Sequence, residues 1–257
     1  MIEPKLVVIR PLAEDGRRLW TLVLSLAREL GPKREWSLIG GLMVQLHAFE
    51  HEDAPRPTAD IDLLGGAKRP PRMTETMASL LVERGAEVAD PPRSDSKLGY
   101  RFELEGETVE LLGPDGLRGD PKTIAGLRTF QAAGGSQALR RTEVVLVSLG
   151  GREPIAVRRP NLLGAILIKA RVVVKKRKGK FESDRQDLVR LLSYVDDPRT
   201  LRAELSRKEP AWLRDAEAAI DFDDPDLAAQ FRGDGVARAR QALGILAQDP
   251  DPASSTK

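Results

Sequence analysis

The feature that most constrains the fold is a short apolar run that ends in two glycines and leads into a helical pattern. Residues 35–39 read as a strand, and Gly40-Gly41 precede apolar residues spaced for a helix at 42–49. At such a junction the first backbone N–H groups of the helix face an anion, and glycine lets a phosphate approach the backbone. The sequence therefore predicts either a phosphate site at Gly40-Gly41 or a tight turn that needs a positive φ angle.

A second strand follows, and it carries two acidic residues. The run Asp60-Ile61-Asp62-Leu63 is β-compatible and leads to Gly65-Gly66. Side chains alternate along a strand, so Asp60 and Asp62 should lie on one face, roughly 7 Å apart at the backbone. Two carboxylates at this spacing can hold a hard cation together with substrate phosphates. The alternative is a solvated edge strand with two surface aspartates.

A third carboxylate is expected on a neighbouring strand. Residues 100–112 alternate as a hairpin, which places Val109 and Leu111 on one side and Glu110 on the other. Glu110 then suits a metal ligand, or the base that accepts a proton from an attacking hydroxyl. Asp115, in the next turn, is the second candidate. For Glu110 the alternative is an exposed position on an amphipathic strand.

An apolar helix that runs into basic residues is predicted from residue 161. A lysine in a buried helix is costly unless its ammonium meets an anion, so Lys169 is predicted to reach a triphosphate. The alternative is a lysine that extends from a core helix to solvent. The basic run at 175–180 is either a nucleic-acid contact or a solvated loop between two helices.

Gly40-Gly41 and the R-x-T-x-D-I-D run at 56–62 together resemble the nucleotidyltransferase-fold toxins of the AbiEii and MenT group, which share a polymerase-β-like core. The resemblance spans residues 30–200. Family members mostly carry Asp at the third carboxylate, so Glu110 is a departure, and Asp187 fits the last acidic position better than Asp184. The resemblance implies a catalytic set of Asp60, Asp62, Glu110, Lys169 and Asp187, metal ligation by Asp60, Asp62 and Glu110, and nucleotide binding by Gly40, Gly41, Arg56, Thr58 and Lys169.

The same resemblance implies an enzyme that uses Mg²⁺ or Mn²⁺ and transfers NMP from an NTP to a hydroxyl acceptor. The acceptor expected by resemblance is the 3′ end of tRNA, and the expected partner is an antitoxin protein that neutralises the chain. Two alternatives stay open. One is nucleotidylation of a small molecule or a protein hydroxyl, and the other is a non-catalytic nucleotide-binding module.

Composition narrows the class of protein. The chain has 257 residues, no cysteine and two histidines, which excludes disulfides and thiolate metal sites and disfavours a multi-histidine centre. Lys plus Arg number 41 against 39 acidic residues, so any RNA-binding surface must be local. Because no secretory leader and no apolar run of about 18 residues is seen, we expect a soluble, cytoplasmic protein with no membrane partner.

The expected fold class is α/β (α+β), with a nucleotidyltransferase core made of a mixed β-sheet flanked by helices, plus a helical C-terminal part. The core is predicted over residues 1–158. Residues 159–248 are predicted to form a helical domain that completes the active site, and residues 249–257 a disordered tail. The apolar spacing predicts helices at 12–30, 74–84, 199–206, 210–220 and 225–247.

Overall fold

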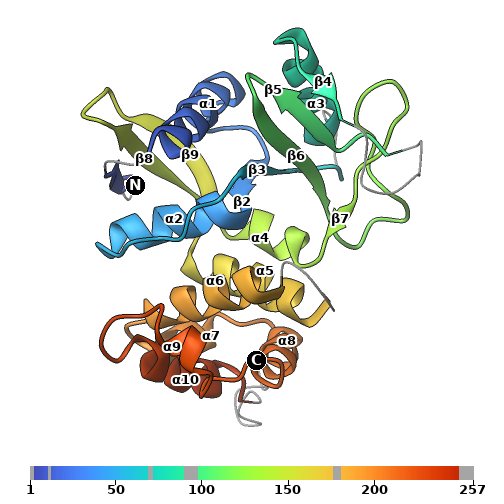
Figure 1. The fold of residues 1–257 in the computed structure, drawn as a ribbon. Coiled ribbons are helices and arrows are strands. Elements are labelled where there is room, and N and C mark those ends of the chain that lie inside the picture. Colours follow the sequence, from blue (N-terminus) through green and yellow to red (C-terminus); the bar gives the residue numbers. More distant parts are fainter. Residues whose placement is uncertain (1–2, 11–12, 69–71, 90–97, 176–180, 249–257) are drawn as a thin grey trace. The chain divides into compact units, whose positions relative to one another are not determined.

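The computed structural model describes residues 3–10, 13–68, 72–89, 98–175 and 181–248. The chain divides into two units, residues 1–164 and 165–257, coloured from blue to red along the sequence in Figure 1. The predicted tail at 249–257 and most of the predicted basic run, residues 176–180, lie outside the described residues.

The first unit is built on two mixed β-sheets, which confirms the predicted fold class. Its strands are β1 (Leu6–Ile9), β2 (Trp36–Ile39), β3 (Asp60–Gly65), β4 (Glu87–Val88), β5 (Arg101–Leu104), β6 (Glu107–Pro114), β7 (Gln131–Ala132), β8 (Thr142–Leu149) and β9 (Ile155–Pro160). The larger sheet has the order β2-β3-β6-β5-β4, with β7 beside β6, and the smaller has the order β1-β8-β9. Strands β3 and β6 are parallel, whereas β2 with β3 and β5 with β6 are antiparallel.

The helices of the first unit form in segments where apolar residues recur every three or four positions, instead of every second position as in the strands. They are α1 (Glu14–Leu30), α2 (Gly40–Glu50), α3 (Met73–Glu83) and α4 (Gly135–Arg140). In α1 the buried residues Leu19, Val23, Leu26 and Leu30 follow a helical period. Helix α1 contacts β9 and β8 and lies alongside that hairpin in Figure 1. It thereby covers an apolar core shared with both sheets.

Strands β3 and β6 each send one face into this core. Ile61 and Val109 are completely buried, and both belong to the cluster that α1 covers. Asp62 and Glu110 alternate with them and therefore lie on the opposite face. The predicted alternation along both strands is confirmed, and it leaves the acidic face of the sheet outside the core.

The second unit is helical. It begins within α5 (Leu162–Lys175) and continues through α6 (Phe181–Ser193), α7 (Pro198–Ala203), α8 (Glu209–Glu217), α9 (Pro225–Ala228) and α10 (Gly235–Leu246). Helix α10 packs against α6, α7 and α8 (Figure 1). The prediction of one helix over 225–247 is wrong, because Gly233 adopts a φ of 59° and separates α9 from α10.

A membrane span needs a long and apolar helix, and none of the helices in the described ranges meets both conditions.

Candidate functional site

The start of α2 lies directly against the aspartate strand. Gly40 has a φ of 69°, and a Cβ atom added there would lie 1.8 Å from Oδ2 of Asp62. A Cβ atom on Gly41 would lie 2.6 Å from Oγ1 of Thr58. Glycine at these two positions therefore lets the helix start approach Asp62 and Thr58. The positive φ predicted for a tight turn is present at Gly40, and phosphate binding at the pair stays a prediction.

The segment that precedes β3 is fixed by a buried glutamine of α2. Gln45 accepts a hydrogen bond from Nε1 of Trp20 at 2.8 Å and donates one to the carbonyl of Arg56 at 3.0 Å. This contact ties the R-x-T-x-D-I-D segment to α2 two residues before Thr58. The predicted nucleotide-binding residue Arg56 thus lies in the connection between α2 and β3, next to the aspartate strand.

The outer face of the larger sheet carries a row of charged side chains across three strands. Asp62 of β3 pairs in register with Glu110 of β6, and Glu110 pairs with Arg101 of β5. One step along the strands, Asp60 pairs with Thr108. The two aspartates and Glu110 therefore share one face, as the sequence predicts for a nucleotidyltransferase-type site.

Arg101 is a residue of this face to which the sequence assigned no role. Its Nε and Nη2 atoms donate to Oε1 of Glu110 at 3.1 and 2.6 Å. This hydrogen bond raises the pKa of Arg101 above its ordinary value, burial opposes the rise, and the negative charge of Asp60 adds to it. Within the described part of the chain, Oε2 of Glu110 accepts no hydrogen bond. One oxygen of Glu110 is thus held by Arg101 while the other is open.

The donor set on this face suits a cation that completes its coordination with substrate oxygens. Among the described residues, no group of three or more His, Cys, Asp or Glu side chains could by itself hold a metal ion. Asp60 and Asp62 face the same side of β3, and magnesium is commonly bound by one or two carboxylates plus phosphates. Asp60 and Asp62 could therefore supply two ligands of a cation. Metal binding here, and Glu110 as a third ligand, stay predictions.

Asp115, the second candidate for the third carboxylate, caps α4. Its Oδ2 and Oδ1 atoms accept from the backbone N–H groups of Gly134 and Ser136 at 2.9 and 2.8 Å. Burial acts to raise the pKa of Asp115, but these hydrogen bonds outweigh burial and lower it. Asp115 also lies five residues beyond Glu110, about 16 Å along an extended chain. The geometry therefore favours Glu110.

Lys169 lies in the second unit, between two carboxylates of α6. Its Nζ atom donates to Oδ1 of Asp184 at 3.0 Å and to Oδ2 of Asp187 at 2.7 Å. Burial acts to lower the pKa of Lys169, but the charges of Asp187 and Asp184 outweigh burial and raise it. The ammonium is therefore charged and held inside the unit, and the alternative of a lysine extending to solvent is wrong.

The predicted site residues thus fall into two groups. Gly40, Gly41, Arg56, Thr58, Asp60, Asp62 and Glu110 belong to the first unit, and Lys169 and Asp187 belong to the second. Within each unit the structure brings the members together. That both groups serve one active site stays a prediction.

Comparison with known proteins supports the fold. No protein-family model matches the sequence, and no curated protein matches it significantly. A solved structure that is similar to this chain is that of an antigenic nucleotidyltransferase-like protein from Paracoccidioides brasiliensis, with a TM-score of 0.51 and 17% identity over 86% of this chain and 94% of that chain. The chain has a nucleotidyltransferase-like fold. At 17% identity this similarity shows a shared fold. It does not show that the chain belongs to the AbiEii and MenT toxin group.

Proposed function

We propose that the protein is a metal-dependent nucleotidyltransferase, which transfers NMP from an NTP to a hydroxyl acceptor. The observation that carries this proposal is the placement of Asp62 against Gly40 at the start of α2, with Asp60 on the same face of β3. A helix N-terminus attracts phosphate oxygens, and paired carboxylates attract the cation that accompanies them. The nucleotidyltransferase-like fold supports the same conclusion.

Asp60 and Asp62 are the residues that would hold the metal ion, with Glu110 as an additional ligand or as the base. When bound, Mg²⁺ or Mn²⁺ neutralises charge on the triphosphate and on the leaving group. The protein's own contribution is mostly positioning and electrostatics, since phosphoryl transfer requires little covalent chemistry from side chains.

The reaction is a displacement at the α-phosphorus of the NTP. The acceptor oxygen forms a bond to phosphorus, the bond from phosphorus to the bridging oxygen breaks, and pyrophosphate leaves with the electron pair. The hydroxyl proton passes to a carboxylate, for which Oε2 of Glu110 is available while Arg101 holds Oε1. Arg101 also places a cation beside the aspartates, where it can contact a phosphate oxygen.

The proposed acceptor is RNA, with the tRNA 3′ end first, and the proposed setting is a toxin neutralised by an antitoxin. Both proposals come from the resemblance of Gly40-Gly41 and residues 56–62 to the toxin group. The same site geometry would serve a small-molecule or protein hydroxyl, and it would also serve a module that binds nucleotides without turnover.

The test follows labelled NMP from each NTP into RNA, protein and small-molecule fractions, with total tRNA and Mg²⁺ present. Label in RNA supports the lead acceptor, and label elsewhere supports one of the alternatives. Asp60→Asn should abolish transfer because it removes a metal ligand without changing side-chain size, whereas Asp53→Asn, seven residues earlier, should not. Transfer that survives in Asp60→Asn would refute the assignment. Growth arrest on expression of the wild type but not of Asp60→Asn tests the toxin role.

A further inference from the structure

A basic pocket of about 270 Å³ lies beside α1 in the first unit. The described residues that line it come from the end of β1, from α1 and from the turn between β8 and β9. The described lining residues include Arg10, Arg17 and Arg152, and no acidic residue is among them. Arg10 and Arg17 lie seven residues apart, whereas Arg152 comes from a turn far along the chain, so the fold brings Arg152 to the other two arginines.

The lining of the pocket combines buried apolar residues with polar ones. Ile9 and Leu149 pair in register at the carboxyl ends of the parallel strands β1 and β8, and both are buried. Arg17 and Thr21 line the pocket from one face of α1, since they are four residues apart. Gly150 and the next glycine adopt positive φ angles and turn the chain so that Arg152 follows at the rim.

Two of the three arginines have no carboxylate partner among the described residues. In the described part of the chain, neither Arg17 nor Arg152 makes an ion pair or a side-chain hydrogen bond. Arg10 pairs with Glu52 at 3.5 Å, and both side chains are largely exposed, so this pair is weak. Within the described ranges, the pocket therefore holds two arginines without an ion-pair partner.

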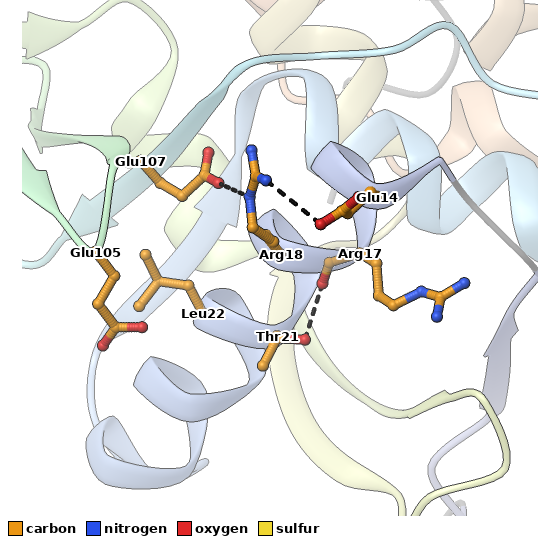
Figure 2. Close-up of a pocket in the computed structure, with 7 residues that line it drawn as sticks. All are labelled: Glu14, Arg17, Arg18, Thr21, Leu22, Glu105 and Glu107. Atoms are coloured by element: carbon orange, nitrogen blue, oxygen red, sulfur yellow. Dashed lines mark hydrogen bonds and ion pairs between the residues drawn. The ribbon is translucent and has the colours of Figure 1, made fainter.

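Arg18, which follows Arg17 in α1, is by contrast paired with carboxylates. Arg18 donates to Asp15 at 2.7 Å and to Glu107 at 3.4 Å. Figure 2 draws a neighbouring pocket that Arg17 and Thr21 also line. It shows Arg18 between Glu107 and Glu14, while the guanidinium of Arg17 points away from these two carboxylates. The two adjacent arginines of α1 thus differ. Arg18 is paired with carboxylates of the protein, whereas the guanidinium of Arg17 has no such partner among the described residues and is available to a ligand.

We propose that this pocket binds phosphate groups. Guanidinium groups recognise phosphate oxygens through paired, charge-assisted hydrogen bonds. The core side of α1 covers Ile61 and Val109, on the face of the sheet opposite to Asp62, so the pocket is separate from the candidate active site. The phosphates come either from a nucleic-acid backbone or from a small phosphorylated compound, and the inference does not depend on the proposed catalytic activity.

The first experiment titrates inorganic tripolyphosphate into the full chain by calorimetry, with EDTA present and at low salt. Wild type should bind saturably, and the double variant Arg17→Ala/Arg152→Ala should bind at least about tenfold more weakly, since two charged hydrogen-bond donors are lost. Arg28→Ala is the matched control. It matches the Arg17→Ala change, because it removes one positive charge from the same helix, eleven residues away and outside the pocket, and should change the affinity by less than about twofold.

A second probe separates the two sources of phosphate. Single-stranded RNA with a 5′ hydroxyl should displace tripolyphosphate if the pocket binds a nucleic-acid backbone, and should fail to displace it if the pocket binds a small phosphorylated compound. The inference is overturned if wild type binds neither probe, or if Arg28→Ala loses as much affinity as the double variant. NMP transfer with Mg²⁺, measured on the same variants, distinguishes failure at this pocket from failure at the aspartate site.

Discussion

At the scale of single residues, Gly40 is the position where the start of α2 and the aspartate strand come closest. We predict that Gly40→Ala lowers NMP transfer about a hundredfold, because a new Cβ atom would displace the Asp62 carboxylate by an ångström or more. The positive φ adds strain, so the free energy of unfolding should fall by about 1–3 kcal/mol. Steady-state transfer and urea denaturation measure the two effects.

Gly31→Ala is the control for Gly40→Ala, because it separates the backbone strain from the contact with Asp62. Gly31 has a φ of 70°, close to that of Gly40, but no described residue lies within 4 Å of a Cβ atom added there. The control should therefore show the strain and keep the activity. Equal loss of transfer in both variants would mean that the contact with Asp62 is irrelevant to the reaction.

Lys169 is the second residue whose environment makes a definite prediction. Lys169→Met should destabilise the protein by about 3–5 kcal/mol, because it leaves Asp184 and Asp187 buried without this cation. Adding Asp184→Asn and Asp187→Asn should recover much of the stability if the lysine has only a structural role. Thermal unfolding reports stability. A KM for NTP that is higher in the triple variant than in the double variant Asp184→Asn/Asp187→Asn, which keeps Lys169, would support the predicted contact of Lys169 with the triphosphate.

At the scale of elements, the cap on α4 tests the choice of third carboxylate. Asp115→Ala removes two acceptors at the start of this short helix and should cost about 1–2 kcal/mol of stability. Transfer by the folded variant should stay near the wild-type rate. Glu110→Ala should instead cause a large loss of transfer. If only Asp115→Ala lost transfer, Asp115 and not Glu110 would be the third carboxylate.

The elements that local patterns could reveal were predictable from the sequence. The strand before Gly40, the helix after it and the aspartate strand all follow from residue spacing, and they appear as β2, α2 and β3. Strand β1 was missed because four residues give little periodicity and their partner β8 is distant in sequence. Helix α4 was missed because it begins at Gly134-Gly135, a pair that indicates a turn.

The role of Arg101 was within reach of the sequence. A two-residue turn at Glu105-Gly106 pairs Leu104 with Glu107, and counting outward pairs Arg101 with Glu110. What the sequence could not supply is the close approach of Gly40 to Asp62, because it depends on the register that pairs Ile39 with Asp62. The pairing of Lys169 with both Asp184 and Asp187 was inaccessible because it depends on how the side chains of two helices pack.

At the scale of the whole molecule, a buried histidine should make stability depend on pH. His47 is buried, and its Nε2 atom lies 3.1 Å from the carbonyl oxygen of Pro160. Burial and the nearby charge of Arg159 hold the pKa of His47 well below its ordinary value of 6.5. The unfolded chain therefore takes up a proton at a pH where the folded chain does not.

The sign of the effect follows from this difference. The stability that neutral His47 provides is present above pH 6.5 and is lost as pH falls below it, with a limiting slope of about 1.4 kcal/mol per pH unit. Urea denaturation between about pH 7.5 and 5.5 measures the slope. His47→Gln should flatten it, whereas His51→Gln, which changes the other histidine of the chain, should not. An unchanged slope in His47→Gln would contradict the prediction.

The parallel pairing of β1 with β8 has a consequence for synthesis of the chain. Leu6 pairs with Leu146, so β1 leaves the ribosome before its partner β8, which is made about 140 residues later. During translation the apolar side chains of β1 have no sheet to join, whereas β2, α2 and β3 are adjacent in sequence and can assemble early. A nascent chain halted before Thr142 would therefore carry the aspartate strand but leave β1 without its partner β8.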